Sequence, residues 1–186
     1  METIEIINRR NGVDLNVLGG TVAAMKQDPV LGHGKFRVQN SWTDGSRNTS
    51  SISGFYGARH EMTHSQVFQI HADEPPILAG SDEAPNPVEI LLSALAACLT
   101  TSLVAHAAVA GVELGSVETE IEGDLDLNGF LGLDPNVPKG FSDIRVKMAV
   151  KADSDNELKI RRLALFSPVF HTLTEGVNVS VDIDLK

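Results

Sequence analysis

One long apolar stretch, residues 87–111, constrains the fold more than any other feature, and it contains the chain's only cysteine, Cys98. Asn86 and Pro87 are typical of a helix N-cap and first turn, and Gly111 is typical of a helix end. We therefore predict one continuous helix from Pro87 to Gly111. The stretch is long enough to raise the question of a membrane span. Its interspersed polar residues and its excess of alanine over leucine favour a helix buried in a protein core.

The lone thiol of Cys98 cannot form a disulfide within its own chain, so it is either inert packing or a reactive group with an external partner. A buried cysteine commonly behaves as a small hydrophobe. On a helical wheel Cys98 shares its face with Leu95 and Ser102, while Glu89 falls on the opposite side. His106 lies about 80° away, two turns further along. The residues alone leave both roles open.

The rest of the chain shows alternating strand patterns and two more helices. Asp44-Gly45 is a strong hairpin signal between two of the strands. The order of elements indicates an α+β fold, with antiparallel strands and with helices on one side. We predict strands over residues 4–8, 35–42, 47–55, 66–72, 117–127, 144–150 and 177–185, and a loop over 128–140. One helix is predicted from Asp14 to about Gln27. Another is predicted from about Asp155, with Leu158, Leu163 and Phe166 on its apolar face.

Composition excludes some partners. The chain has 186 residues, enough for one domain with a sizeable core, and a formal charge of −10. Nucleic-acid binding needs clustered Lys and Arg, so we expect no nucleic-acid partner. A single cysteine and an N-terminus without the pattern of a signal peptide favour the cytoplasm. We also expect no membrane association.

His60-Glu61-Met-Thr-His64 matches the H-E-x-x-H pattern of zinc proteases. That motif works on a helix, where residues four apart share one face. Here it runs into a strand pattern, and four residues of extended chain span roughly 13 Å, too far for both rings to hold one ion. We therefore expect an exposed loop at these residues and no metal site.

The helix segment from Asn86 to Cys98, Asn-Pro-Val-Glu-Ile-Leu-Leu-Ser-Ala-Leu-Ala-Ala-Cys, resembles the central-helix signature of the OsmC/Ohr family (osmotically inducible protein C-like, organic hydroperoxide resistance). The similarity covers roughly residues 35–185. It divides the chain into an N-terminal strand and helix extension, 1–34, and an OsmC-like domain, 35–186. Further matches lie at Gly111, Val117, Gly123, Gly140-Phe141, Ala152-Asp153 and Phe166-Ser-Pro-Val-Phe-His-Thr-Leu173.

The resemblance implies an intertwined homodimer whose antiparallel sheets wrap around two long central helices, with sites at the dimer interface. Active members of the family reduce hydroperoxides with a reactive cysteine, which corresponds to Cys98. The thiolate attacks the peroxide and becomes a sulfenic acid. Ser167 stands where the family has its resolving cysteine. Because serine cannot form a disulfide, reduction here would need an external thiol.

The resemblance also implies groups that stabilise the thiolate. Val88 stands where the family has its helper glutamate, and Glu89 is one residue late, a rotation of about 100°. The segment before Pro87 that carries the family's helper arginine has no arginine here. The remaining candidates for this support are Ser102, His106, Arg37, Arg47 and Arg59.

Two functions follow as hypotheses. One is a one-cysteine, thiol-dependent hydroperoxide reductase of oxidative stress defence, with Cys98 as nucleophile. The alternative is a non-catalytic relative that binds a small apolar ligand at the dimer interface. A zinc hydrolase built on His60, Glu61 and His64 is an outside possibility. We expect no cofactor for either main hypothesis.

Overall fold

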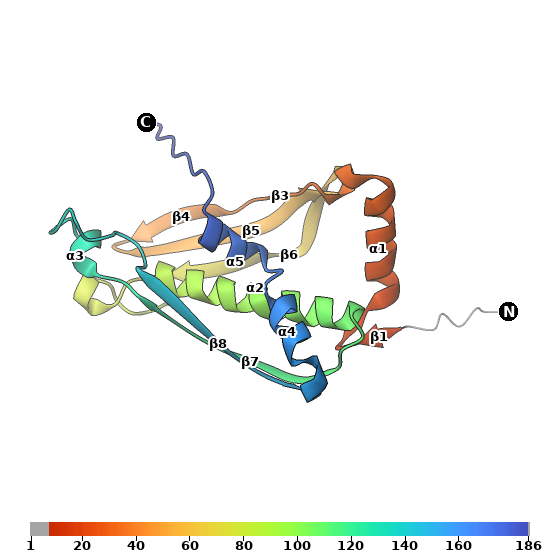
Figure 1. The fold of residues 1–186 in the computed structure, drawn as a ribbon. Coiled ribbons are helices and arrows are strands. Elements are labelled where there is room, and N and C mark those ends of the chain that lie inside the picture. Colours follow the sequence, from red (N-terminus) through yellow and green to blue (C-terminus); the bar gives the residue numbers. More distant parts are fainter. Residues whose placement is uncertain (1–7, 186) are drawn as a thin grey trace. The chain divides into compact units, whose positions relative to one another are not determined.

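The computed structural model describes residues 8–185 of the chain. All of the strand predicted over residues 4–8 except Asn8 lies outside the described residues. The chain divides into two compact units, which are treated separately below. Within the described range, the first unit comprises Asn8 and residues 14–91, and the second comprises residues 9–13 and 92–185. Figure 1 shows the α-helices and strands of both.

The helix α1 (Leu15–Gln27) confirms the prediction from Asp14. The Asp14 carboxylate accepts hydrogen bonds from two backbone N–H groups of the first turn at 3.0 and 3.1 Å, as an N-cap does. A short 3-10 helix (Pro29–Gly32) follows directly. Two-residue strands β1 (Arg9–Arg10) and β2 (Val13–Asp14) precede α1.

The first unit contains a four-stranded antiparallel sheet whose central strand is β5 (Arg47–Gly57). On one side β5 pairs with β3 (Lys35–Phe36) and β4 (Gln39–Asp44), and on the other with β6 (His60–Ala72). The hairpin at Asp44-Gly45 is confirmed. The strand predicted over residues 35–42 is instead interrupted between β3 and β4, and β6 begins six residues before the predicted start at Gln66.

Asp73 anchors the connector that leads from β6 to the long helix. Its side chain is buried, with 1% exposed. The carboxylate accepts a 2.6 Å hydrogen bond from the Ser46 hydroxyl and three more from the backbone N–H groups of Glu74, Ser81 and Glu83. Together these bonds outweigh the desolvation of the carboxylate and hold the pKa of Asp73 at about 2, with the Ser46 bond as the largest cause. The connector is thus tied to the turn of the β4–β5 hairpin.

The long helix α2 (Pro87–Val109) confirms the prediction, and Gly111 follows its end with a φ of +79°. Distant side chains bind carbonyls at this end: Arg10 donates to Ala108 O of α2 at 3.2 Å, and Lys159 Nζ donates to Ala110 O, just after the helix, at 2.6 Å. A stripe of side chains four residues apart is buried. These are Leu95, Leu99, Leu103 and Ala107.

The burial of α2 is less complete than the predicted core helix requires. By length and composition it could cross a membrane, a test that core helices of soluble proteins also pass. Over its 18-residue apolar window the mean hydropathy is 2.0, yet only 17% of that window is buried. The other residues of that window are half-buried or exposed.

The second unit contains a two-stranded antiparallel ribbon, β7 (Leu114–Asp124) and β8 (Asp143–Ala152). Its register places Thr119 opposite Met148 and Ile121 opposite Val146 on an apolar face. The other face carries Arg145, which binds the carboxylates of Glu122, Asp124 and Asp143 at 2.6–2.7 Å. The strand predicted to reach Leu127 ends at Asp124, because Asp126 caps a short helix, α3 (Leu127–Phe130), inside the predicted loop.

The helix predicted from about Asp155 consists of three pieces: a 3-10 helix (Ser154–Asn156), α4 (Glu157–Ala164) and α5 (Pro168–Glu175). Two of the three side chains predicted on its apolar face are largely exposed, Leu158 at 75% and Phe166 at 58%. The strand predicted over 177–185 is also absent. Among the described residues that segment has no strand partner, and its apolar side chains are all at least 66% exposed.

Candidate functional site

Cys98 is a free thiol on α2 and is half-buried. It precedes Leu99 of the buried stripe and is therefore rotated by about 100° from it. Thr101 Oγ1 donates a 3.3 Å hydrogen bond to the Cys98 carbonyl rather than to its sulfur. Cys98 thus lies beside the buried stripe and is neither fully buried nor fully exposed.

Glu89 has a structural role. The Glu89 N–H donates to Asn86 Oδ1 at 2.9 Å, and the Asn86 N–H donates to Glu89 Oε2 at 2.9 Å. This reciprocal pair is a capping box, which satisfies two N–H groups at the start of α2. The carboxylate predicted as a helper of the thiolate is therefore engaged at the helix N-terminus.

The three candidate arginines are all paired with carboxylates of the first unit. Arg37 binds Glu61 at 2.7 Å, and this bond lowers the pKa of Glu61. Arg59 binds Asp28 at 2.7 Å. Arg47 bridges Asp44 and Glu83 at 3.1 Å each.

The remaining candidates lie in the second unit. His106 stacks on Phe166, with ring centroids 4.3 Å apart. Ser167 is fully buried, and its hydroxyl accepts a 3.1 Å hydrogen bond from the Phe170 N–H, so it is the N-cap of α5. Ser102 is half-buried one turn after Cys98. The structure therefore gives Ser167 a capping role at the position that the resemblance assigns to a resolving cysteine.

The H-E-x-x-H residues lie on strand β6, so the predicted loop is wrong. Glu61 pairs with Arg37, and the His64 ring contacts Phe55 and Phe68, with centroids 5.6 and 5.4 Å apart. On an extended strand His60 and His64 lie on the same face but roughly 13 Å apart, too far for both rings to hold one ion. Within residues 8–185, no group of three or more His, Cys, Asp or Glu side chains is placed to hold a metal ion.

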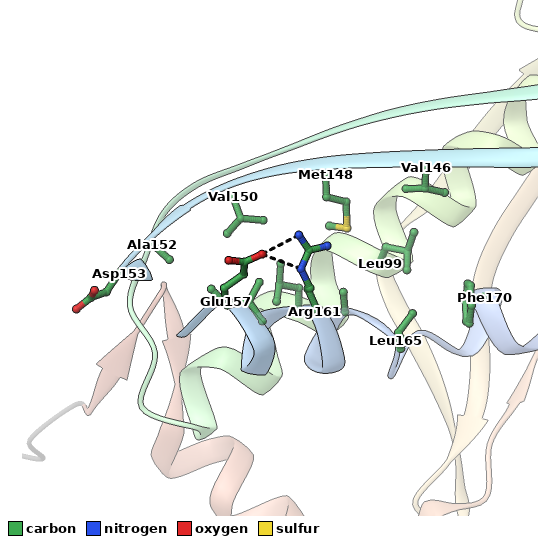
Figure 2. A pocket seen from close by; sticks show the side chains of 13 residues that line it. Leu99, Val146, Met148, Val150, Ala152, Asp153, Glu157, Arg161, Leu165 and Phe170 are labelled. Atoms are coloured by element: carbon green, nitrogen blue, oxygen red, sulfur yellow. Dashed lines mark hydrogen bonds and ion pairs between the residues drawn. The ribbon is translucent and has the colours of Figure 1, made fainter. Parts of the chain in front are cut away.

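The second unit also contains an apolar cavity of about 570 Å³ (Figure 2). Four elements contribute its walls: α2, β8, α4 with the residue that follows it, and α5. Sequence reasoning placed none of these residues in a site, although the alternation of β8 marks one wall. The apolar lining consists of Leu99, Leu103, Val146, Met148, Val150, Ala152, Ile160, Ala164, Leu165 and Phe170.

Three charged residues complete the lining: Asp153, Glu157 and Arg161. Arg161 donates from Nε and Nη2 to Glu157 Oε1, at 3.0 and 2.8 Å. Figure 2 shows the guanidinium extending toward Met148, while Asp153 points outward at the far end. The cavity is therefore an apolar chamber with one cation among its lining groups.

Comparison with known proteins supports the fold. The family model described as OsmC-like protein matches residues 80–182. An OsmC-like protein from Mycoplasma pneumoniae has a similar structure, with a TM-score of 0.57 and 20% identity over 78% of this chain and 96% of its own. An OsmC-like protein of unknown function from Vibrio cholerae gives a TM-score of 0.52 and 13% identity over 75% and 94%. No curated protein matches this chain by sequence.

Proposed function

We propose that this chain, which belongs to the OsmC-like protein family, binds an apolar small molecule in the cavity of its second unit. One observation carries the proposal: α2, β8, α4 and α5 converge on a chamber of about 570 Å³ whose walls are predominantly apolar. Ligand sites are typically concave and apolar, with a few polar groups that fix orientation. This site lies within one chain, whereas the sequence-based hypothesis placed the ligand at a dimer interface.

The expected affinity is moderate. Each buried methylene contributes about 0.8 kcal/mol, so a chain of eight carbons contributes roughly 6 kcal/mol. That free energy corresponds to a dissociation constant of tens of micromolar at best. Titration calorimetry with 1-decanol therefore suits the measurement.

A pair of neighbouring substitutions tests the site. Val146→Trp adds bulk to a cavity wall that is 39% exposed, so the larger ring can be accommodated without straining the core. Lys147→Trp places the same ring on the opposite face of β8. We expect Val146→Trp to weaken decanol binding at least tenfold and Lys147→Trp to leave it unchanged. Absence of binding to the wild type, or equal losses in both variants, would refute the proposal.

We further propose that the chain forms a homodimer. The support is the exposed apolar side chains of Leu91 and Val109 on α2 and those of residues 177–185. Surfaces of this kind on a folded chain are typical of association sites. Light scattering after size exclusion would show twice the chain mass of 19.9 kDa, and a single-chain mass at tens of micromolar would contradict it.

A second candidate function rests on the half-buried Cys98. In this reaction the Cys98 thiolate attacks the distal oxygen of a hydroperoxide, the O–O bond breaks, and the alcohol leaves after taking up a proton. The resulting sulfenic acid condenses with an external thiol to a mixed disulfide and water. A second external thiol then releases the Cys98 thiolate and departs as the oxidised disulfide.

Hydroperoxide consumption in excess dithiothreitol tests this candidate. Wild type and Cys98→Ser are compared under the same conditions, with folding checked by circular dichroism. Turnover that Cys98→Ser abolishes would support the one-cysteine reaction. Equal consumption in both proteins would reject it.

A further inference from the structure

The ion pair between Arg161 and Glu157 at the apolar cavity has the features of a weak interaction. Both Arg161–Glu157 bonds use one carboxylate oxygen, Glu157 Oε1, so the interaction is not the two-oxygen fork of a strong pair. The side chains are 72% and 66% exposed and lie four residues apart on α4. Exposed pairs of this kind contribute little to stability. Arg161 can therefore exchange Glu157 for another carboxylate at low cost.

The guanidinium also has unused donor capacity. In the described part of the chain, no hydrogen bond involves Arg161 Nη1. Figure 2 shows the group reaching toward the Met148 side chain, and so toward the cavity wall formed by β8. Asp153 is directed away from it in the same view, so Glu157 is the only carboxylate that Arg161 contacts among the described residues. A planar guanidinium with a free edge suits a ligand carboxylate.

We propose that the ligand of this cavity is an amphipathic carboxylate, with its apolar chain inside the chamber and its carboxylate on Arg161. This inference rests on the proposed function. The apolar chain lies against Val146, Leu165 and Phe170, and the carboxylate displaces Glu157 from the guanidinium. Glu157 then competes with the ligand's head group for Arg161. The guanidinium of Arg161 selects ligands whose head group is negatively charged.

Titration calorimetry of the full chain with decanoate and 1-decanol at pH 7 tests the head-group preference. We expect the wild type to bind decanoate about tenfold more tightly than decanol. Arg161→Gln should abolish that preference while keeping decanol binding. Glu157→Gln should tighten decanoate binding a few-fold because the competitor is removed. Arg162→Gln, which removes the same charge from the next residue of α4, should leave both affinities unchanged.

Several results would overturn the inference. Equal affinities of the wild type for decanoate and decanol would leave the apolar site intact but remove the role of Arg161. The same loss in Arg161→Gln and Arg162→Gln would indicate a general charge effect. Decanoate binding that appears only after removal of residues 177–186 would show that the chain's own C-terminal segment occupies the cavity. Failure of both ligands would refute the proposed function itself.

Discussion

His106 on α2 stacks on Phe166 in the link between α4 and α5, with ring centroids 4.3 Å apart and ring planes inclined by 27°. Phe166 directly precedes Ser167, the buried N-cap of α5. The stack therefore helps to fix where α5 begins, and α5 supplies Phe170 to the cavity. Phe166 is 58% exposed, so the contact contributes through this stack more than through burial.

We predict that Phe166→Ala lowers the free energy of unfolding by about 1 kcal/mol more than a control substitution, the typical value of an aromatic pair beyond its burial. Phe130→Ala is a matched control because Phe130 is 57% exposed and has no ring contact among the described residues. Urea unfolding at one protein concentration measures both. Equal losses would show that the stack contributes nothing.

A second prediction concerns acid. The pKa of Asp73 is lowered to about 2, so its carboxylate stabilises the fold above the ordinary pKa near 4, and this stabilisation is lost as the pH falls toward 2. We expect Asp73→Asn to melt several degrees below the wild type at pH 7, with the difference shrinking at pH 2.5. Asp155 is exposed, so Asp155→Asn is the control. We expect Asp155→Asn to melt close to the wild type at both pH values. A difference that is constant from pH 7 to pH 2.5 would contradict the assignment.

The capping box gives a third prediction. Asn86→Ala removes the acceptor for the Glu89 N–H and should cost about 1 kcal/mol. Asn86→Asp keeps an acceptor there and should cost much less. Thermal melts monitored by circular dichroism at 222 nm would compare the two. If both variants have the same melting temperature, below that of the wild type, loss of the cap does not explain the destabilisation.

The C-terminal segment gives a fourth prediction. In an extended chain Val179 and Val181 share one face, and Asn178 and Ser180 share the other. If the apolar face is covered in the proposed homodimer, Val179→Asp with Val181→Asp should yield monomers at micromolar concentration. Asn178→Asp with Ser180→Asp adds the same charge to the other face and should remain dimeric. Sedimentation velocity distinguishes them, and identical behaviour would exclude this face from the interface.

The elements that sequence predicts best are those with local signals. Asp14 caps α1, Asp44-Gly45 turns the hairpin, and strict alternation marks β7 and β8. The capping role of Glu89 also had a local signal, because Asn86-x-x-Glu89 is a capping-box pattern. Sequence spacing did not predict the carboxylate partners of the arginines, because those partners come from segments that only the fold brings together.

Two errors have physical reasons that lie outside local sequence. Pro168 has no N–H and starts a new helix after the Ser167 cap, so the second predicted helix splits. Residues 177–185 alternate as a strand does, but a strand needs a partner edge, and within the described chain this segment has none. The cavity escaped prediction because its walls come from four separated segments.

Residues 177–185 expose an alternating row of apolar side chains. A short alternating run of β-branched residues is the kind of sequence that stacks into cross-β aggregates. Asp182 and Asp184 interrupt it on the polar side. Copies stacked in register would bring these carboxylates together, and their repulsion disfavours that assembly. The two aspartates thus disfavour such stacking, and their repulsion weakens at high salt.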